Sequence, residues 1–232
     1  MIGCLFLHGF TGSPFEVEPL VTYVKEYTSW IVSCPFLPGH EEDGSLKGVK
    51  YTEWIHAAEQ ALVELQKQCE TIYVIGFSMG GMIAAYLASV YPVDKLVLLS
   101  AAAFYISPRQ IRRDMHELIE DTFHGLLLEN ELYLRYKKKI MKTPISAAVQ
   151  FRKLVTKHRP LLNKINTPTL IAQGLQDGIV PYQTAQYLYN QIVTKEKRVV
   201  WLDDCKHLIC HCQNRDWLFK EILSFLRAER NL

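Results

Sequence analysis

Ser78 lies in a Gly-x-Ser-x-Gly pattern formed by residues 76–80, the stretch of the chain best suited to chemistry. An apolar, β-branched run precedes the serine and a helix-forming run follows it, which predicts a sharp strand-to-helix turn. Such a turn exposes the serine hydroxyl, and Gly76 and Gly80 allow neighbouring backbone to pack closely. The pattern predicts a nucleophilic serine. The alternative is a turn serine that caps a helix.

A serine nucleophile needs a general base, and the base needs a carboxylate that orients it. His207 comes shortly after a predicted strand and is the best candidate for the base. Asp177 follows another predicted strand, at the end where ligand sites of open parallel sheets collect. We predict that Asp177 is the acid, and the alternative is an ordinary Asp-Gly turn. Asp203 and Asp204 are rivals, but they lie too close to the histidine to come from a separate strand.

Hydrolysis through a tetrahedral intermediate also needs backbone N–H groups aimed at the developing oxyanion. One donor should be the N–H of Met79, directly after the serine, and the other should come from the loop after the first strand. In that loop Phe10 is the natural candidate, because Gly9 and Gly12 let the backbone fold toward the site. His8 is expected to brace this loop by hydrogen bonds rather than to act as a base.

A group of cysteines and histidines near the predicted base could also be interpreted as a soft-metal site. Its members are Cys205, His207, Cys210, His211 and Cys212. Their spacing is not that of a zinc finger or a metalloprotease, and no second cysteine pair completes a tetrahedral set. We therefore expect no metal and no cofactor, and we expect His211 to point away from the serine.

The composition indicates a globular protein: 49% of the 232 residues are hydrophobic and 22% are charged. This length suits one large domain, or a core with a small insertion. The net charge of +2 gives no indication of a nucleic-acid partner. No apolar run reaches about 18 residues, so we expect no stable membrane insertion.

The first residues form a short apolar run without a basic start, which is typical of a buried strand rather than a signal peptide. We therefore expect a cytoplasmic protein whose six cysteines are reduced thiols. They are Cys4, Cys34, Cys69, Cys205, Cys210 and Cys212.

Apolar, β-rich runs alternate with helical patterns along the chain, which predicts parallel βαβ units. The predicted strands are residues 2–7, 30–34, 71–75, 95–100, 169–173 and 198–202. The predicted helices are residues 14–27, 51–69, 79–91, 181–191 and 215–226. Between residues 104 and 159 the pattern is helical throughout, and Lys and Arg outnumber Asp and Glu by twelve to six. This charge indicates a solvated helix face or, alternatively, steering of anionic substrates.

Taken together, these motifs resemble the α/β-hydrolase superfamily, and more narrowly the small bacterial carboxylesterases of the monoacylglycerol-lipase-like group. The matching stretches, in the order of that family, are residues 8–12, 38–40, 76–81, 177–181 and His207. The resemblance implies Ser78 as nucleophile, Asp177 as acid and His207 as base, with Phe10 and Met79 as oxyanion residues.

The resemblance also implies an α/β-hydrolase fold with a mainly parallel sheet of about six strands. The core would comprise residues 1–103 and 160–232, and a helical lid would span residues 104–159. Compared with the family, the chain starts at what would be the third strand, so one or two antiparallel edge strands are expected to be absent. Cys205 and Lys206 replace the small residues that usually precede the base.

From these observations we predict a serine carboxylesterase that hydrolyses short- to medium-chain esters through an acyl-enzyme. Its substrate pocket is expected to be lined by Phe15, Phe104, Phe123, Leu127 and Ile179. The alternatives are a monoacylglycerol lipase, a thioesterase, a C–C bond hydrolase, an acyltransferase or perhydrolase with the same triad, and a non-catalytic binding protein. The partner would be a small-molecule ester, and a monomer is slightly favoured.

Overall fold

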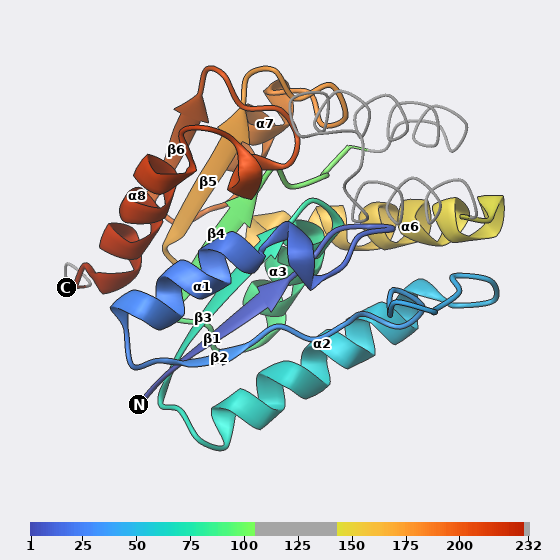
Figure 1. Cartoon of the computed structure of the whole chain (residues 1–232), viewed down its shortest axis with the longest axis horizontal. Coiled ribbons are helices and arrows are strands. Elements are labelled where there is room, and N and C mark those ends of the chain that lie inside the picture. Colours follow the sequence, from blue (N-terminus) through green and yellow to red (C-terminus); the bar gives the residue numbers. More distant parts are fainter. Residues whose placement is uncertain (105–142, 230–232) are drawn as a thin grey trace.

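The computed structural model describes residues 1–104 and 143–229, which build a six-stranded, wholly parallel sheet (Figure 1). The strands are β1 (Ile2–Leu7), β2 (Ile31–Ser33), β3 (Thr71–Phe77), β4 (Lys95–Leu99), β5 (Thr169–Gly174) and β6 (Lys197–Leu202). Their order across the sheet is β2-β1-β3-β4-β5-β6. All six predicted strands are confirmed, with ends that differ by at most two residues, and the α/β-hydrolase fold is confirmed with them.

Successive strand residues point to opposite faces of the sheet, and each face is covered by helices. Leu5 and Leu7 face one core with α2 (Tyr51–Gln66), α3 (Met79–Val90), α6 (Ile145–His158) and α7 (Gln183–Gln191). Cys4 and Phe6 face the other, with α1 (Glu18–Tyr27) and α8 (Arg215–Arg227). Short 3-10 turns cover Pro14–Glu16 (η1), Arg159–Lys164 (η2) and Ile209–His211 (η3). Burial on both faces explains why the central strands are nearly continuous apolar runs.

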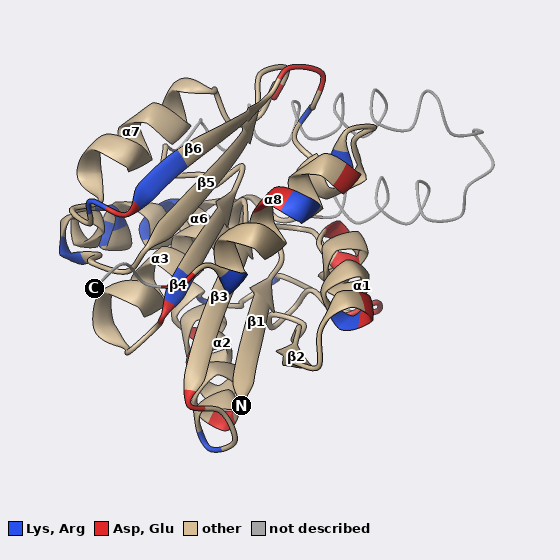
Figure 2. Ribbon diagram, turned by 90° about the vertical axis from the view of Figure 1, so that its left-hand side faces the viewer, with Lys and Arg blue, Asp and Glu red and all other residues tan. Residues whose placement is uncertain are grey.

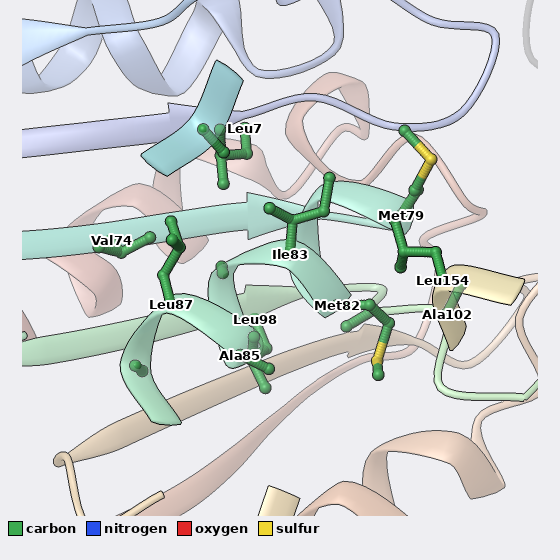
Figure 3. Close-up of a cluster of buried hydrophobic side chains, with 14 of the residues drawn as sticks. Leu7, Val74, Met79, Met82, Ile83, Ala85, Leu87, Leu98, Ala102 and Leu154 are labelled. Carbon is green, nitrogen blue, oxygen red and sulfur yellow. The ribbon is translucent and has the colours of Figure 1, made fainter. Parts of the chain in front are cut away.

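Helix α3 lies against the middle of the sheet and makes a large part of the first core. Figure 3 shows Ile83 and Leu87 of this helix beside the strand residues Leu7, Val74 and Leu98, all of them buried. Charged residues occur mainly on the outer helices and loops, while β1, β3 and β5 contain none (Figure 2). This packing fixes the N-terminus of α3 beside the carboxyl ends of β1 and β3.

The predicted lid is described only in part, because residues 105–142 lie outside the described ranges. Its last helix, α6, packs against α2 and α3 and buries Phe151 and Leu154 in the first core. The division into core and lid remains a prediction. Within residues 1–104 and 143–229, no helix combines the length and the apolar character that crossing a membrane requires.

Candidate active site

Ser78 sits at the sharp turn between β3 and α3, as the sequence predicts. Its backbone has φ 53° and ψ −115°, a conformation that residues other than glycine rarely adopt. A Cβ on Gly76 would lie 2.2 Å from the Gly80 carbonyl oxygen, and one on Gly80 would lie 2.3 Å from the Leu7 carbonyl oxygen. Gly76 is therefore required for the turn to close against α3, and Gly80 for the start of α3 to pack against the end of β1.

His207 joins Ser78 to Asp177 although the three residues come from distant parts of the chain. Its Nε2 lies 3.1 Å from Ser78 Oγ, and its Nδ1 lies 2.8 Å from Asp177 Oδ2. Since the carboxylate can only accept, Nδ1 carries the proton and Nε2 is left to accept the serine O–H. All three side chains are buried, and the ring of Phe77 packs against that of His207. This is the geometry that a serine nucleophile and its base require.

The carboxylate of Asp177 is held by four donors. Oδ1 accepts the backbone N–H groups of Ile179 (2.9 Å) and Val180 (2.8 Å), and Oδ2 accepts Gln173 Nε2 (3.0 Å) as well as His207. Sequence reasoning missed Gln173, which lies at the end of β5 and is buried. The sequence did contain a signal for Gln173, because it is a glutamine at the end of a mainly apolar strand. A buried side-chain amide needs hydrogen-bond partners, which would have pointed to a neighbouring polar group.

The two expected oxyanion residues lie where the loop after β1 meets the start of α3. Met79 is the first residue of α3, so its N–H has no acceptor within the helix. The N–H of Phe10 has no acceptor among the described residues. The contact of Gly80 with the Leu7 and His8 carbonyls shows that the two segments touch. Neither N–H group donates a hydrogen bond within residues 1–104 and 143–229, and their role as oxyanion donors remains a prediction.

The loop after β1 is braced by His8, as expected. The His8 ring places Nδ1 2.9 Å from the Gly9 carbonyl oxygen and Nε2 3.1 Å from the Leu37 nitrogen. Since a carbonyl accepts and an N–H donates, His8 is protonated on Nδ1. Its two nitrogens are both engaged with backbone, which leaves neither to take a proton from a substrate.

Backbone strain among the described residues is concentrated around this site. Thr11, Ser78 and Ser100 are the non-glycine residues with positive φ there, at 62°, 53° and 44°. Each follows the carboxyl end of a neighbouring strand, namely β1, β3 or β4. Such a conformation costs roughly 1–3 kcal/mol and persists only where the surroundings enforce it, which is common at functional sites.

The residues predicted to line the substrate pocket are only partly brought together. Ile179 lies next to the acid, through its bond to Asp177. Phe15 packs against His211 in a tilted arrangement with 4.5 Å between ring centroids, and Phe104 packs on Tyr187 of α7. Phe123 and Leu127 lie outside the described residues.

His211 points away from the serine, as expected. Its Nε2 lies 2.9 Å from the Phe15 carbonyl oxygen. Burial, the largest effect, lowers the pKa of His211, so the ring is favoured in its neutral form and donates this hydrogen bond. His211 therefore links η1 to η3, the turn that follows His207.

A disulfide bond joins Cys205 to Cys212, so the expectation of six reduced cysteines was wrong for this pair. The η3 turn brings Cys212 back to a Cα–Cα distance of 5.5 Å from Cys205, within the range that a disulfide spans. The other four cysteines are free. The bond encloses His207 in a short loop and occupies two of the sulfur atoms that a soft-metal site would need.

We expect Cys205→Ala with Cys212→Ala to lower the free energy of unfolding by about 2.5 kcal/mol, the loop-closure value for about eight residues. Urea unfolding of the variant and of wild type, each with and without dithiothreitol, measures this. Cys34→Ala is the matched control, because Cys34 is free and half-buried. Alkylation of all six cysteines in unreduced, unfolded protein would contradict the disulfide.

Comparison with known proteins places this geometry among hydrolases. The family model described as "Serine aminopeptidase, S33" matches residues 49–213, which include Ser78, Asp177 and His207. A thermostable monoacylglycerol lipase of Bacillus sp. (strain H-257) is 28% identical over 97% of this chain and 90% of that protein. A carboxylesterase of Bacillus subtilis (strain 168) is 24% identical over 96% of this chain and 91% of that protein.

A solved structure gives the same fold. It comes from a study of LipS and LipT, two metagenome-derived lipolytic enzymes, and aligns with a TM-score of 0.79 and 23% identity. The alignment covers 97% of this chain and 93% of that one. The similarity supports the fold described above.

Proposed function

Because the chain belongs to the serine aminopeptidase S33 family of hydrolases, we propose that this ester hydrolase is a carboxylesterase for short- to medium-chain esters. One observation carries the proposal: His207 bridges Ser78 and Asp177 with contacts of 3.1 and 2.8 Å. A cap serine needs no such histidine, whereas a nucleophile does. The carboxylesterase and lipase relatives support ester hydrolysis in particular.

The reaction proceeds through an acyl-enzyme. Ser78 Oγ bonds to the ester carbonyl carbon while its proton passes to His207 Nε2, and the carbonyl oxygen becomes an oxyanion held by the Phe10 and Met79 N–H groups. His207 then gives that proton to the leaving alcohol as the C–O bond breaks. A water attacks the acyl group by the same route, and releases the acid and free Ser78. Asp177 keeps His207 in the required tautomer throughout.

A monoacylglycerol lipase is the second candidate. This candidate is favoured by the similarity to the monoacylglycerol lipase of Bacillus sp., which is 28% identical in an alignment that spans nearly the whole chain. A thioesterase would use the same residues, and it differs only in the leaving group. The monomeric state and the cytoplasmic location remain predictions.

The proposal is tested with p-nitrophenyl esters from acetate to palmitate, alongside 1-monoacylglycerols, acyl thioesters and amino-acid p-nitroanilides. We expect the highest kcat/KM on short or medium esters, and one fluorophosphonate bound per chain, at Ser78 by peptide mass spectrometry. A higher kcat/KM on monoacylglycerols would favour the lipase. Inactivity on every ester together with no labelling of Ser78 would overturn both candidates.

A further inference from the structure

The loop that carries Phe10 is fixed on both sides by buried side chains from elsewhere in the chain. The Gly9 N–H donates to Glu16 Oε2 at 2.6 Å, and the Thr11 N–H donates to His40 Nε2 at 3.1 Å. Phe10 lies between these two anchored N–H groups, and its own N–H has no acceptor among residues 1–104 and 143–229. Of three consecutive donors, only the middle one is left for a ligand.

The second anchor depends on the tautomer of His40. Nδ1 lies 3.2 Å from the carbonyl oxygens of both Leu37 and Pro38, and two acceptors require that Nδ1 carries the proton. Nε2 is then an acceptor, as the Thr11 N–H demands. The ring is fully buried and packs edge-on against Phe10, at 6.4 Å between ring centroids. His40 thus contacts the oxyanion loop both through a hydrogen bond to its backbone and through side-chain packing.

Thr11, the residue whose N–H is held by His40, also has a strained backbone. Thr11 has φ 62°, in the left-handed region that a β-branched side chain avoids. The surrounding contacts must hold such a conformation, since the residue would otherwise relax to negative φ. Rotation at Thr11 would turn the Phe10–Thr11 peptide, whose N–H is the one that His40 accepts. The peptide that presents the Phe10 N–H joins this peptide at the Phe10 Cα, so it would be displaced as well.

We propose that His40 is a positioning residue for the oxyanion hole, an inference that rests on the proposed esterase function. By accepting the Thr11 N–H, it holds Thr11 at positive φ and keeps the Phe10 N–H aimed at the carbonyl oxygen of the substrate. His40 touches no substrate atom in this role. The hydrogen bond from the Phe10 N–H to the substrate oxygen is strongest when negative charge develops on that oxygen. Misplacing this N–H by loss of the His40 contact therefore lowers kcat and leaves KM nearly unchanged.

The test compares His40→Phe, which keeps a ring but removes the acceptor, with His40→Gln, which returns an acceptor on a flexible side chain. We expect His40→Phe to lower kcat by about 10- to 100-fold, less than the loss on deleting an oxyanion donor. The Ki of a trifluoromethyl ketone, which forms a tetrahedral adduct with Ser78, should rise in proportion to the fall in kcat/KM. His40→Gln should recover most of both losses.

His158→Phe is the matched control. His158 is also buried and also bonds a backbone carbonyl through Nδ1, that of Leu154 at 2.8 Å, but it lies at the end of α6. Urea unfolding shows whether the two Phe variants lose comparable stability. We expect only His40→Phe to lose kcat.

Two outcomes would overturn the inference. One is a folded His40→Phe enzyme with wild-type kcat, and the other is a loss that appears in KM alone or equally in His158→Phe. Failure of the proposed function looks different, because wild type itself would then neither hydrolyse esters nor bind the fluorophosphonate.

Discussion

Ser78→Ala is expected to lower kcat for ester hydrolysis by about 10⁵- to 10⁶-fold, the size of loss that removal of a serine nucleophile produces. The variant keeps the backbone conformation, because alanine and serine differ only by the hydroxyl. Ser78 Oγ is the atom that His207 Nε2 contacts, and alanine leaves the base with no proton to take. Residual rate would come from water attack helped by the oxyanion donors.

Initial rates on the best p-nitrophenyl ester, together with fluorophosphonate labelling, measure this effect. Ser100→Ala is a matched control, because Ser100 is a buried serine with positive φ at the end of the adjacent strand. Its hydroxyl has no hydrogen-bond partner in the described part of the chain, so its removal should leave kcat unchanged. If Ser78→Ala kept more than about a hundredth of wild-type kcat, Ser78 would not be the nucleophile.

Asp177→Asn is expected to lower kcat by about 10⁴-fold, as the equivalent change does in a serine protease triad. The structure explains why in atomic terms. The N–H groups of Ile179 and Val180 both donate to Oδ1, so the amide oxygen of asparagine must take that position. Its NH₂ group then faces His207 Nδ1, which has to accept, and the imidazole proton moves to Nε2. In that tautomer His207 cannot act as a base toward Ser78.

Gln173 strengthens this expectation, because its Nε2 donates to Oδ2 of Asp177. In the Asp177→Asn variant this donor would meet the NH₂ group of the introduced amide, donor to donor. The variant should therefore lose some stability as well as rate, and urea unfolding with initial rates separates the two effects. Asp203→Asn and Asp204→Asn are the controls, since both carboxylates are exposed and were the rivals for the acid. Loss of kcat in either, with Asp177→Asn active, would reassign the acid.

The sequence by itself determined the elements and the three residues of the candidate site. Strand and helix patterns are local, since they depend on which neighbours are apolar at a spacing of two or of three to four residues. The motif that marks the turn at Ser78 is local as well, because its two glycines lie at fixed offsets from the serine. Asp177 and His207 followed from a general rule of parallel sheets, in which strand ends collect at one edge.

Only the tertiary structure decided how those residues are held. Gln173 reaches Asp177 across a turn, and His40 reaches Thr11 across 29 residues. The Cys205–Cys212 disulfide depends on the path of η3, and it contradicted a prediction made from the expected compartment. Phe15, predicted for the substrate pocket, lies on His211. A residue type and its sequence neighbours do not specify these contacts, because each is set by the packing of segments whose separation in space is fixed only when the whole sheet has formed.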